Sequence, residues 1–194
     1  MNNFLRNVVA LLLAISVVCP AVASGADHWI IAPQLCRGRA HSEAAKAARW
    51  QFDPEQRVSL ASVDSGTMFT SVFPGEASNF VVDVKLRLAD GSQCRLTLGD
   101  ATFDVTNSGH RTELLTGEKE HGIDNNADSG DWTLLTVKRR EGMMSAHLNG
   151  QHALDLGSDI RAIENIGLQS TRGTIAVSSF VLTGDLQQRN LTNR

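Results

Sequence analysis

The densest run of oxygen-bearing side chains lies between Asp124 and Asp131, where the sequence reads DNNADSGD. Asp124, Asn126 and Asp128 alternate with other residues, a spacing that lets a loop wrap its oxygen ligands around calcium. An EF-hand is excluded, because the sixth loop position is not glycine and the twelfth is Leu135 rather than glutamate. The alternative is a turn in which these side chains bond to the local backbone. No motif in the sequence requires a cofactor, and calcium is the one cofactor that these residues could bind.

A cation and a carboxylate, Arg95 and Glu113, interrupt the apolar alternation of their segments and are expected to point away from the core. A carboxylate with a raised pKa can act as a general acid or base in glycoside cleavage or elimination. Plain hydrolysis normally needs a second carboxylate, and Asp104, Glu118 and Glu120 are candidates that no spacing distinguishes. The alternative is a solvated ion pair between strands.

The histidines, the glycine-containing motifs and the tryptophans give little support to further functions. His147 and His152 flank a turn and are expected to face each other, but catalytic zinc keeps three protein ligands. A glycine-rich phosphate loop and a Gly-x-Ser-x-Gly motif are both absent from the sequence, which gives nucleotide binding and α/β-hydrolase chemistry no support. Trp29, Trp50 and Trp132 would form either a platform for a sugar or part of the packing.

Composition excludes whole classes of partner. The 194 residues carry 18 Lys and Arg against 21 Asp and Glu, so the formal charge of −3 offers no basic surface for a nucleic acid. Hydrophobic residues at 42% and charged residues at 20% are typical of one globular domain. Tyrosine is absent and aromatic residues make up 5%, so few rings are available for a surface that binds sugars by stacking.

The first 26 residues have the pattern of a secretory signal peptide. A short positive region ends at Arg6, an apolar run follows from Val8 to Val18, and small residues then allow cleavage after Ala23 or Ala26. The apolar run is too short to span a bilayer, which takes about 20 residues. We therefore expect a secreted or periplasmic protein with no stable membrane span after cleavage and a single domain over residues 27–194.

Removal of the signal peptide leaves two cysteines, Cys36 and Cys94, in an oxidising compartment. A bridge between them would close a loop of about 58 residues and stabilise the fold by roughly 4 kcal/mol in the chain-entropy model. The alternative is two separate buried thiols. Neither cysteine has the paired spacing of a zinc site.

From residue 58 onward the hydrophobic pattern has a period of two, which indicates half-buried strands. The clearest runs are Phe80 to Leu88 and Cys94 to Leu98, and the Asp90-Gly91 turn between them predicts that they pair as a hairpin. Further strands are expected over Thr102 to Thr106, Arg111 to Leu115, Trp132 to Arg139, Met143 to Leu148, Ala153 to Leu156, Ile166 to Ser170 and Thr174 to Leu182.

Asn149-Gly150 is the strongest hairpin signal in the chain. Arg39 to Trp50 differs from the rest, because its composition favours one or two helical turns, although it would also serve as an arm that connects strands. Many short strands without alternating helices predict an all-β sandwich or barrel.

Three ordered motifs resemble the C-terminal half of the 3-keto-disaccharide hydrolase family. They are a tryptophan that opens the strand at Trp132, the Asn149-Gly150 hairpin, and Ile166-Gly167-Leu168-Gln169 before a last apolar strand. The resemblance covers roughly Gly130 to Leu182 and implies a concanavalin A-like jelly-roll sandwich of two antiparallel sheets.

The resemblance also implies that Arg95 and Glu113 lie on the concave face as catalytic residues. The chain departs from the family around both, because Gly91-Ser92-Gln93-Cys94-Arg95 lacks the usual Asn-Ser-Gly and Arg111-Thr112-Glu113-Leu114 lacks the flanking Tyr and Gln. The implied function is cleavage of the glycosidic bond of an oxidised disaccharide or glucoside. The alternatives are a non-catalytic module that binds a glycan or a cell-envelope partner, and a structural envelope domain without a ligand.

Overall fold

The fold is described by a computed structural model that covers residues 27–30, 50–70, 72–74, 79–124, 132–157, 163 and 165–188. The expected signal peptide and the expected helical segment lie outside these residues, except for Trp50, which is buried and directly precedes a strand. The described chain consists almost entirely of antiparallel strands, in two large sheets and one small one.

The eight-stranded sheet has the order β13-β12-β11-β6-β15-β3-β2, and β1 pairs with the far half of β15. Its strands are β1 (Asp27–Ile30), β2 (Gln51–Asp53), β3 (Val58–Ser62), β6 (Phe80–Leu88), β11 (Trp132–Arg140), β12 (Met143–Leu148), β13 (Gln151–Leu156) and β15 (Thr174–Gly184).

The six-stranded sheet has the order β10-β9-β8-β7-β14-β4. Its strands are β4 (Met68–Phe69), β7 (Gln93–Leu98), β8 (Ala101–Asn107), β9 (Arg111–Thr116), β10 (Lys119–Asp124) and β14 (Ile166–Arg172). A small sheet of β5 (Val72–Pro74) and β16 (Leu186–Gln188) and a 3-10 turn, η1 (Val63–Ser65), complete the described elements.

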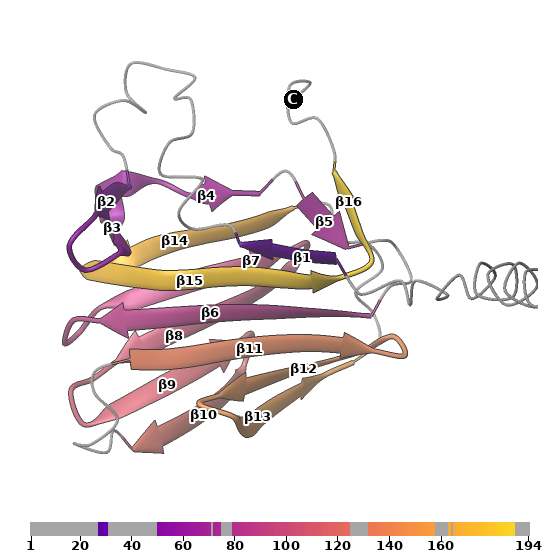
Figure 1. The fold of residues 1–194 in the computed structure, drawn as a ribbon. Coiled ribbons are helices and arrows are strands. Elements are labelled where there is room, and N and C mark those ends of the chain that lie inside the picture. The colour runs from indigo at the N-terminus through magenta and orange to yellow at the C-terminus, as the bar shows by residue number, and fades with distance from the viewer. Residues whose placement is uncertain are drawn as a thin grey trace, which may run out of the picture.

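The two large sheets face each other across one core, with β15, β6 and β11 in front of β7, β8 and β9 in Figure 1. Alternation decides which side chains enter this core: Val82, Val84 and Leu86 of β6 are fully buried, as are Leu96 and Phe103 from the opposite sheet. Each such side chain contributes about 1.5–3 kcal/mol by leaving water. The predicted all-β jelly-roll sandwich of two antiparallel sheets is confirmed.

The predicted hairpin between Phe80–Leu88 and Gln93–Leu98 is wrong. β6 pairs with β11 and β15, whereas β7 pairs with β8 and β14, so the Asp90-Gly91 turn carries the chain from one sheet to the other. Gly91 has the positive φ expected of the turn, but its backbone N–H bonds to Asn107 at the end of β8. The turn itself forms as predicted, but the pairing of β6 and β7 depends on strands that lie far away in the sequence.

The Asn149-Gly150 hairpin between β12 and β13 is confirmed, with positive φ at both turn residues, as a type I′ turn requires. The seven further predicted strands are all present, with ends that differ by up to two residues. The strand Lys119–Asp124 was not predicted, because its sequence KEHGID lacks the alternation of apolar residues.

Candidate functional site

The candidate site is the solvent-facing side of the six-stranded sheet, which we call the polar face. Alternation turns Arg95 outward between Cys94 and Leu96, and Asp104 outward between Phe103 and Val105. Residues directly opposite each other in the strand register share a face. The polar face therefore includes Gln93, Arg95, Thr97, Thr102, Asp104, Thr106, Glu113, Gly167, Gln169 and, at the edge strand, Phe69, together with the charged residues Arg111, Glu120, Asp124 and Arg172 nearer its margins.

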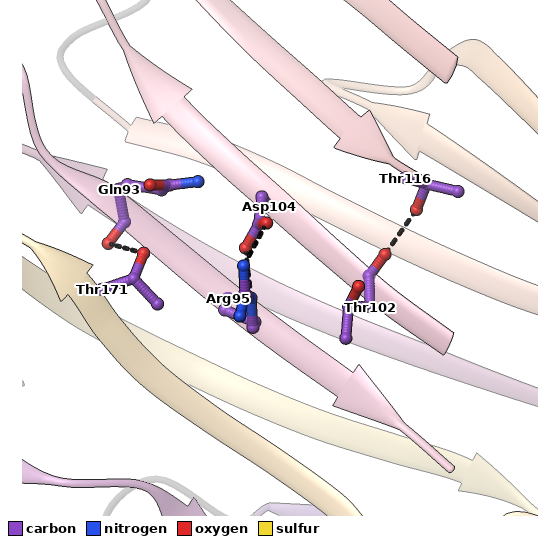
Figure 2. Close-up of polar contacts among 6 residues, drawn as sticks. All are labelled: Gln93, Arg95, Thr102, Asp104, Thr116 and Thr171. Carbon is purple, nitrogen blue, oxygen red and sulfur yellow. Dashed lines mark hydrogen bonds and ion pairs between the residues drawn. The ribbon is translucent and has the colours of Figure 1, made fainter. Parts of the chain in front are cut away.

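Arg95 and Asp104 form the best-defined polar contact on this face. Nε and Nη2 of Arg95 donate to the two carboxylate oxygens of Asp104, each over 2.7 Å, and Figure 2 shows the pair between β7 and β8. The hydrogen bond to Asp104 raises the pKa of Arg95 above its usual value, although partial burial acts in the opposite direction. The Arg95 side chain is 38% exposed and that of Asp104 is 16% exposed, so a ligand can reach both.

Glu113 lies on the same face but not in contact with this pair. It stands opposite Thr106 on β8 and Gly122 on β10, and one of its oxygens lies 3.6 Å from Nε of Arg111. Gly122 makes this contact possible, because a Cβ there would lie 2.0 Å from the same Nε atom. The expected ion pair between Arg95 and Glu113 is therefore wrong, since each side chain has another partner.

The three candidates for a second carboxylate, Asp104, Glu118 and Glu120, differ in their position relative to Arg95. Asp104 is the only one of the three in contact with Arg95, since Glu118 lies in the exposed β9–β10 turn and Glu120 is exposed on β10. Sequence reasoning left these three equivalent. A strict count of cross-strand register from a short β7–β8 hairpin would have placed Asp104 opposite Arg95.

Phe69 is the feature of the polar face that sequence reasoning missed. It pairs with Gly167, and a Cβ on that glycine would lie 3.1 Å from the Phe69 ring, so the ring covers Gly167. The Phe69 side chain is nevertheless 50% exposed. Beside it, the Thr67 hydroxyl donates to Oε1 of Gln169, which fixes that amide on the strand adjacent to Arg95.

The predicted calcium ligands are only partly described. Asp124 is exposed at the end of β10, whereas Asn126 and Asp128 lie outside the described residues. Within the described ranges, no three His, Cys, Asp or Glu side chains come close enough to hold a metal ion.

Cys94 is 1% exposed in the core beneath Arg95, and its sulfur is not joined to another cysteine in this structure. Burial raises the pKa of this thiol, and the charge of Asp104 raises it further. Cys36 lies outside the described residues, so the bridge between the two cysteines stays a prediction.

Trp50, Trp132, His147 and His152 lie away from the polar face. Trp50 is buried and donates through Nε1 to the Gly66 carbonyl, so it packs rather than presents a platform. Trp132 lies on the outer side of the eight-stranded sheet beneath Lys85 and Arg87. The side chain of Trp29, in β1, lies outside the described part. His147 and His152 face each other as predicted, with ring centroids 5.3 Å apart.

No protein-family profile and no curated protein matches this chain. Solved structures do match it. An alginate lyase of polysaccharide lyase family 7, AlgAT5, is 9% identical with a TM-score of 0.51, and the match covers 75% of this chain and 84% of the lyase. An alginate lyase from Corynebacterium sp. is 10% identical, with a TM-score of 0.49 and coverage of 71% and 82%.

Galectin LEC-6 of Caenorhabditis elegans is 12% identical, with a TM-score of 0.39 and coverage of 61% of this chain and 89% of the galectin. In the described part of the chain no helix is long and apolar enough to cross a membrane. The resemblance to the 3-keto-disaccharide hydrolase family stays a prediction. At these identities the likeness to AlgAT5 shows the fold alone, and this chain is similar to jelly-roll sandwich proteins.

Proposed function

We propose that this protein binds a carbohydrate on the polar face of its six-stranded sheet. The observation that carries the proposal is the half-exposed ring of Phe69, which lies over Gly167 on the same face as the Arg95–Asp104 pair. Ligand sites combine an apolar surface with a few fixed polar groups. A sugar offers C–H groups to the ring and hydroxyls to the polar groups.

The polar groups are held in place before any ligand arrives. Two of the five N–H groups of Arg95 are used by Asp104, so three remain for ligand oxygens, and each Asp104 oxygen keeps an unused lone pair. The bond from Thr67 orients the amide of Gln169 between Phe69 and Arg95. Fixed donors and acceptors lower the entropy that binding would otherwise cost.

The charge of this face favours a neutral glycan. Its cations are Arg95, Arg111 and Arg172, and the carboxylates that share its register are Asp104, Glu113, Glu120 and Asp124, so carboxylates outnumber cations by one. An excess of carboxylates repels an acidic polymer. We therefore expect this chain to prefer neutral sugars over acidic ones.

The test is a titration of the protein with neutral oligosaccharides, followed by calorimetry and by amide chemical shifts. Phe69→Ala and Asp104→Asn should each weaken binding at least ten-fold, because one removes the apolar surface and the other loosens Arg95. Leu134→Ala and Asp83→Asn are matched controls from the opposite sheet, where Leu134 is 36% exposed and Asp83 accepts a bond from Thr136.

Equal losses in the test variants and the controls would contradict the proposal, as would shifts confined to the eight-stranded sheet. Thermal unfolding of each variant separates a lost binding group from a lost fold.

A second candidate function, hydrolysis of an oxidised disaccharide or glucoside, is favoured by the positions of Asp104 and Glu113. Asp104 stands opposite Leu115, two residues along β9 from Glu113, so the two carboxylates are diagonal neighbours on one face. The strand positions of diagonal neighbours are about 7–8 Å apart, so side chains that point the same way can place their carboxyl groups at the separation of about 6.5–9.5 Å used by inverting glycosidases. Glu113 would be the general acid, since both Asp104 oxygens already accept from Arg95.

Turnover of a 3-keto-glucoside tests this candidate separately. Glu113→Gln is nearly isosteric but carries no proton to transfer, so it should reduce turnover about 100-fold while glycan binding is retained. Binding without turnover by the unaltered protein would leave the carbohydrate-binding proposal and reject the enzyme.

We also propose that the protein is exported, on the strength of the signal-peptide pattern in residues 1–26. Mass analysis of protein recovered from the secreted or periplasmic fraction should find a chain that begins at Ser24 or Asp27. A chain that retains Met1 in that fraction would contradict cleavage.

A further inference from the structure

The outer side of the eight-stranded sheet contains a groove with a volume of about 820 Å³ near the β11–β12 turn and the end of β13. It is lined by Lys138 and Arg140 of β11, by Met143, Ser145 and His147 of β12, and by Asp155 of β13, among others. The strand register explains the gathering, because Lys138 stands opposite Ser145 and Arg140 opposite Met143. The groove lies on the other sheet from the polar face and is independent of the proposed function.

The charges around this groove are predominantly positive. Lys138 and Arg140 have no acidic partner among the described residues, and Lys119 reaches the rim from β10 by donating to the backbone oxygen of Asp155 over 2.7 Å. Asp155 is the one carboxylate in the lining, and its Oδ1 lies 2.9 Å from Nε2 of His152. The lining therefore holds two cations against one carboxylate that is already paired with His152, in a chain whose formal charge is −3.

The polar groups of the lining are mainly hydrogen-bond donors. Lysine and arginine donate only, and the Ser145 hydroxyl lies 3.3 Å from Nε2 of His147. A tetrahedral dianion presents several oxygen acceptors and no obligatory donors, so its chemistry complements this set. The volume lies within the range of small-molecule sites, about 300–1,000 Å³.

We propose that this groove binds a phosphate or sulfate group, as a free ion or as an ester on a larger ligand. Lys138 and Arg140 supply the charge, and Ser145 and His147 supply the remaining donors. Met143, which is 64% exposed, adds apolar surface to the lining and favours an ester with an apolar part over the free ion.

Protonation of His147 should be coupled to binding. Burial lowers the pKa of His147, and the charges of Lys138 and His152 lower it further, while Asp155 opposes them. An anion in the groove favours the protonated ring, so affinity should rise as the pH falls through this pKa. The charged and titratable groups that surround the ring are Lys138 and Arg140 on β11, His152 and Asp155 on β13, and Lys119 on β10.

Sulfate is the first probe, because it stays dianionic over the range in which histidine titrates. Titration of the full chain at low ionic strength, followed by amide and histidine ring resonances, should saturate at millimolar concentration with shifts at Ser145 and His147. Affinity should increase several-fold between pH 8 and pH 5.5. Titration with inorganic phosphate and with an alkyl phosphate then shows whether the ester is preferred.

Two double variants distinguish sulfate binding at a defined site from a general attraction of anions to positive charge. Lys138→Gln with Arg140→Gln should weaken sulfate binding at least ten-fold. Lys85→Gln with Arg87→Gln removes the same charge from the same side of the sheet, beside Trp132, and should change affinity by less than two-fold.

Equal losses in the two double variants, or shifts that never saturate, would overturn the proposal. An unchanged thermal unfolding curve for the Lys138 and Arg140 double variant would show that its fold is intact.

Discussion

Arg95 and Asp104 face each other across β7 and β8 and share two parallel hydrogen bonds of 2.7 Å. The pair lies directly above the core, because Leu96 and Phe103, the residues next to them in the chain, are fully buried. Two short strands joined by a tight turn therefore place a fixed, ligand-accessible polar pair at the middle of the six-stranded sheet.

Loss of Asp104 should destabilise the fold modestly. Asp104→Ala leaves the half-buried guanidinium of Arg95 without its acceptor, and we expect the free energy of unfolding to fall by about 1 kcal/mol, as partly exposed charged bonds contribute. Urea unfolding measures the change. Glu120→Ala, at an exposed position on β10, is the control and should change stability by less than about 0.5 kcal/mol.

Two glycine substitutions should differ sharply in cost. At Gly122 the added Cβ meets the flexible end of Arg111, which can move aside, so Gly122→Ala should cost less than about 1 kcal/mol and break the contact with Glu113. At Gly184 it meets the backbone oxygen of Asn79 at 2.5 Å, and φ is +148°, so Gly184→Ala should cost more than about 2 kcal/mol. Thermal melts of both variants test this order, and similar melting temperatures would refute it.

Cys94 should resist alkylation in the folded, reduced protein. Its thiol is buried and its pKa is raised, so the reactive thiolate is scarce at neutral pH. Mass analysis after iodoacetamide treatment should show label at Cys94 only once denaturant is added. Rapid labelling under native conditions would mean that β7 opens readily.

The predicted Cys36–Cys94 bridge has its own test. Protein recovered from the secreted fraction and unfolded without reductant should take up no label, because both sulfurs would be joined. Two labels under these conditions would show separate thiols instead.

The predicted calcium ligands are Asp124, Asn126 and Asp128, and a site formed by them should bind calcium. A ligand that binds only the folded state stabilises it by RT ln(1 + [L]/Kd), so millimolar calcium should raise the melting temperature. Asp124→Asn should abolish the rise, and magnesium at the same concentration serves as the control. An unchanged melting temperature would remove calcium from consideration.

The sequence alone determined the fold class and most of the strands. Alternation in segments such as Phe80–Leu88 specifies one buried face, and Asn149-Gly150 specifies a tight hairpin, because both signals act over a few neighbouring residues. The outward orientation of Arg95 and Glu113 followed from the same alternation.

Only the tertiary structure decided which strands are neighbours. β6 and β7 are adjacent in the sequence but belong to opposite sheets, because β6 pairs with β11 and β15, which come more than 40 residues later in the chain. The separation of Glu113 from Arg95, the ring of Phe69 over Gly167, and the groove between β11 and β13 follow from such pairings. Contacts of this kind depend on the register of distant strands, which local hydrophobic patterns do not encode.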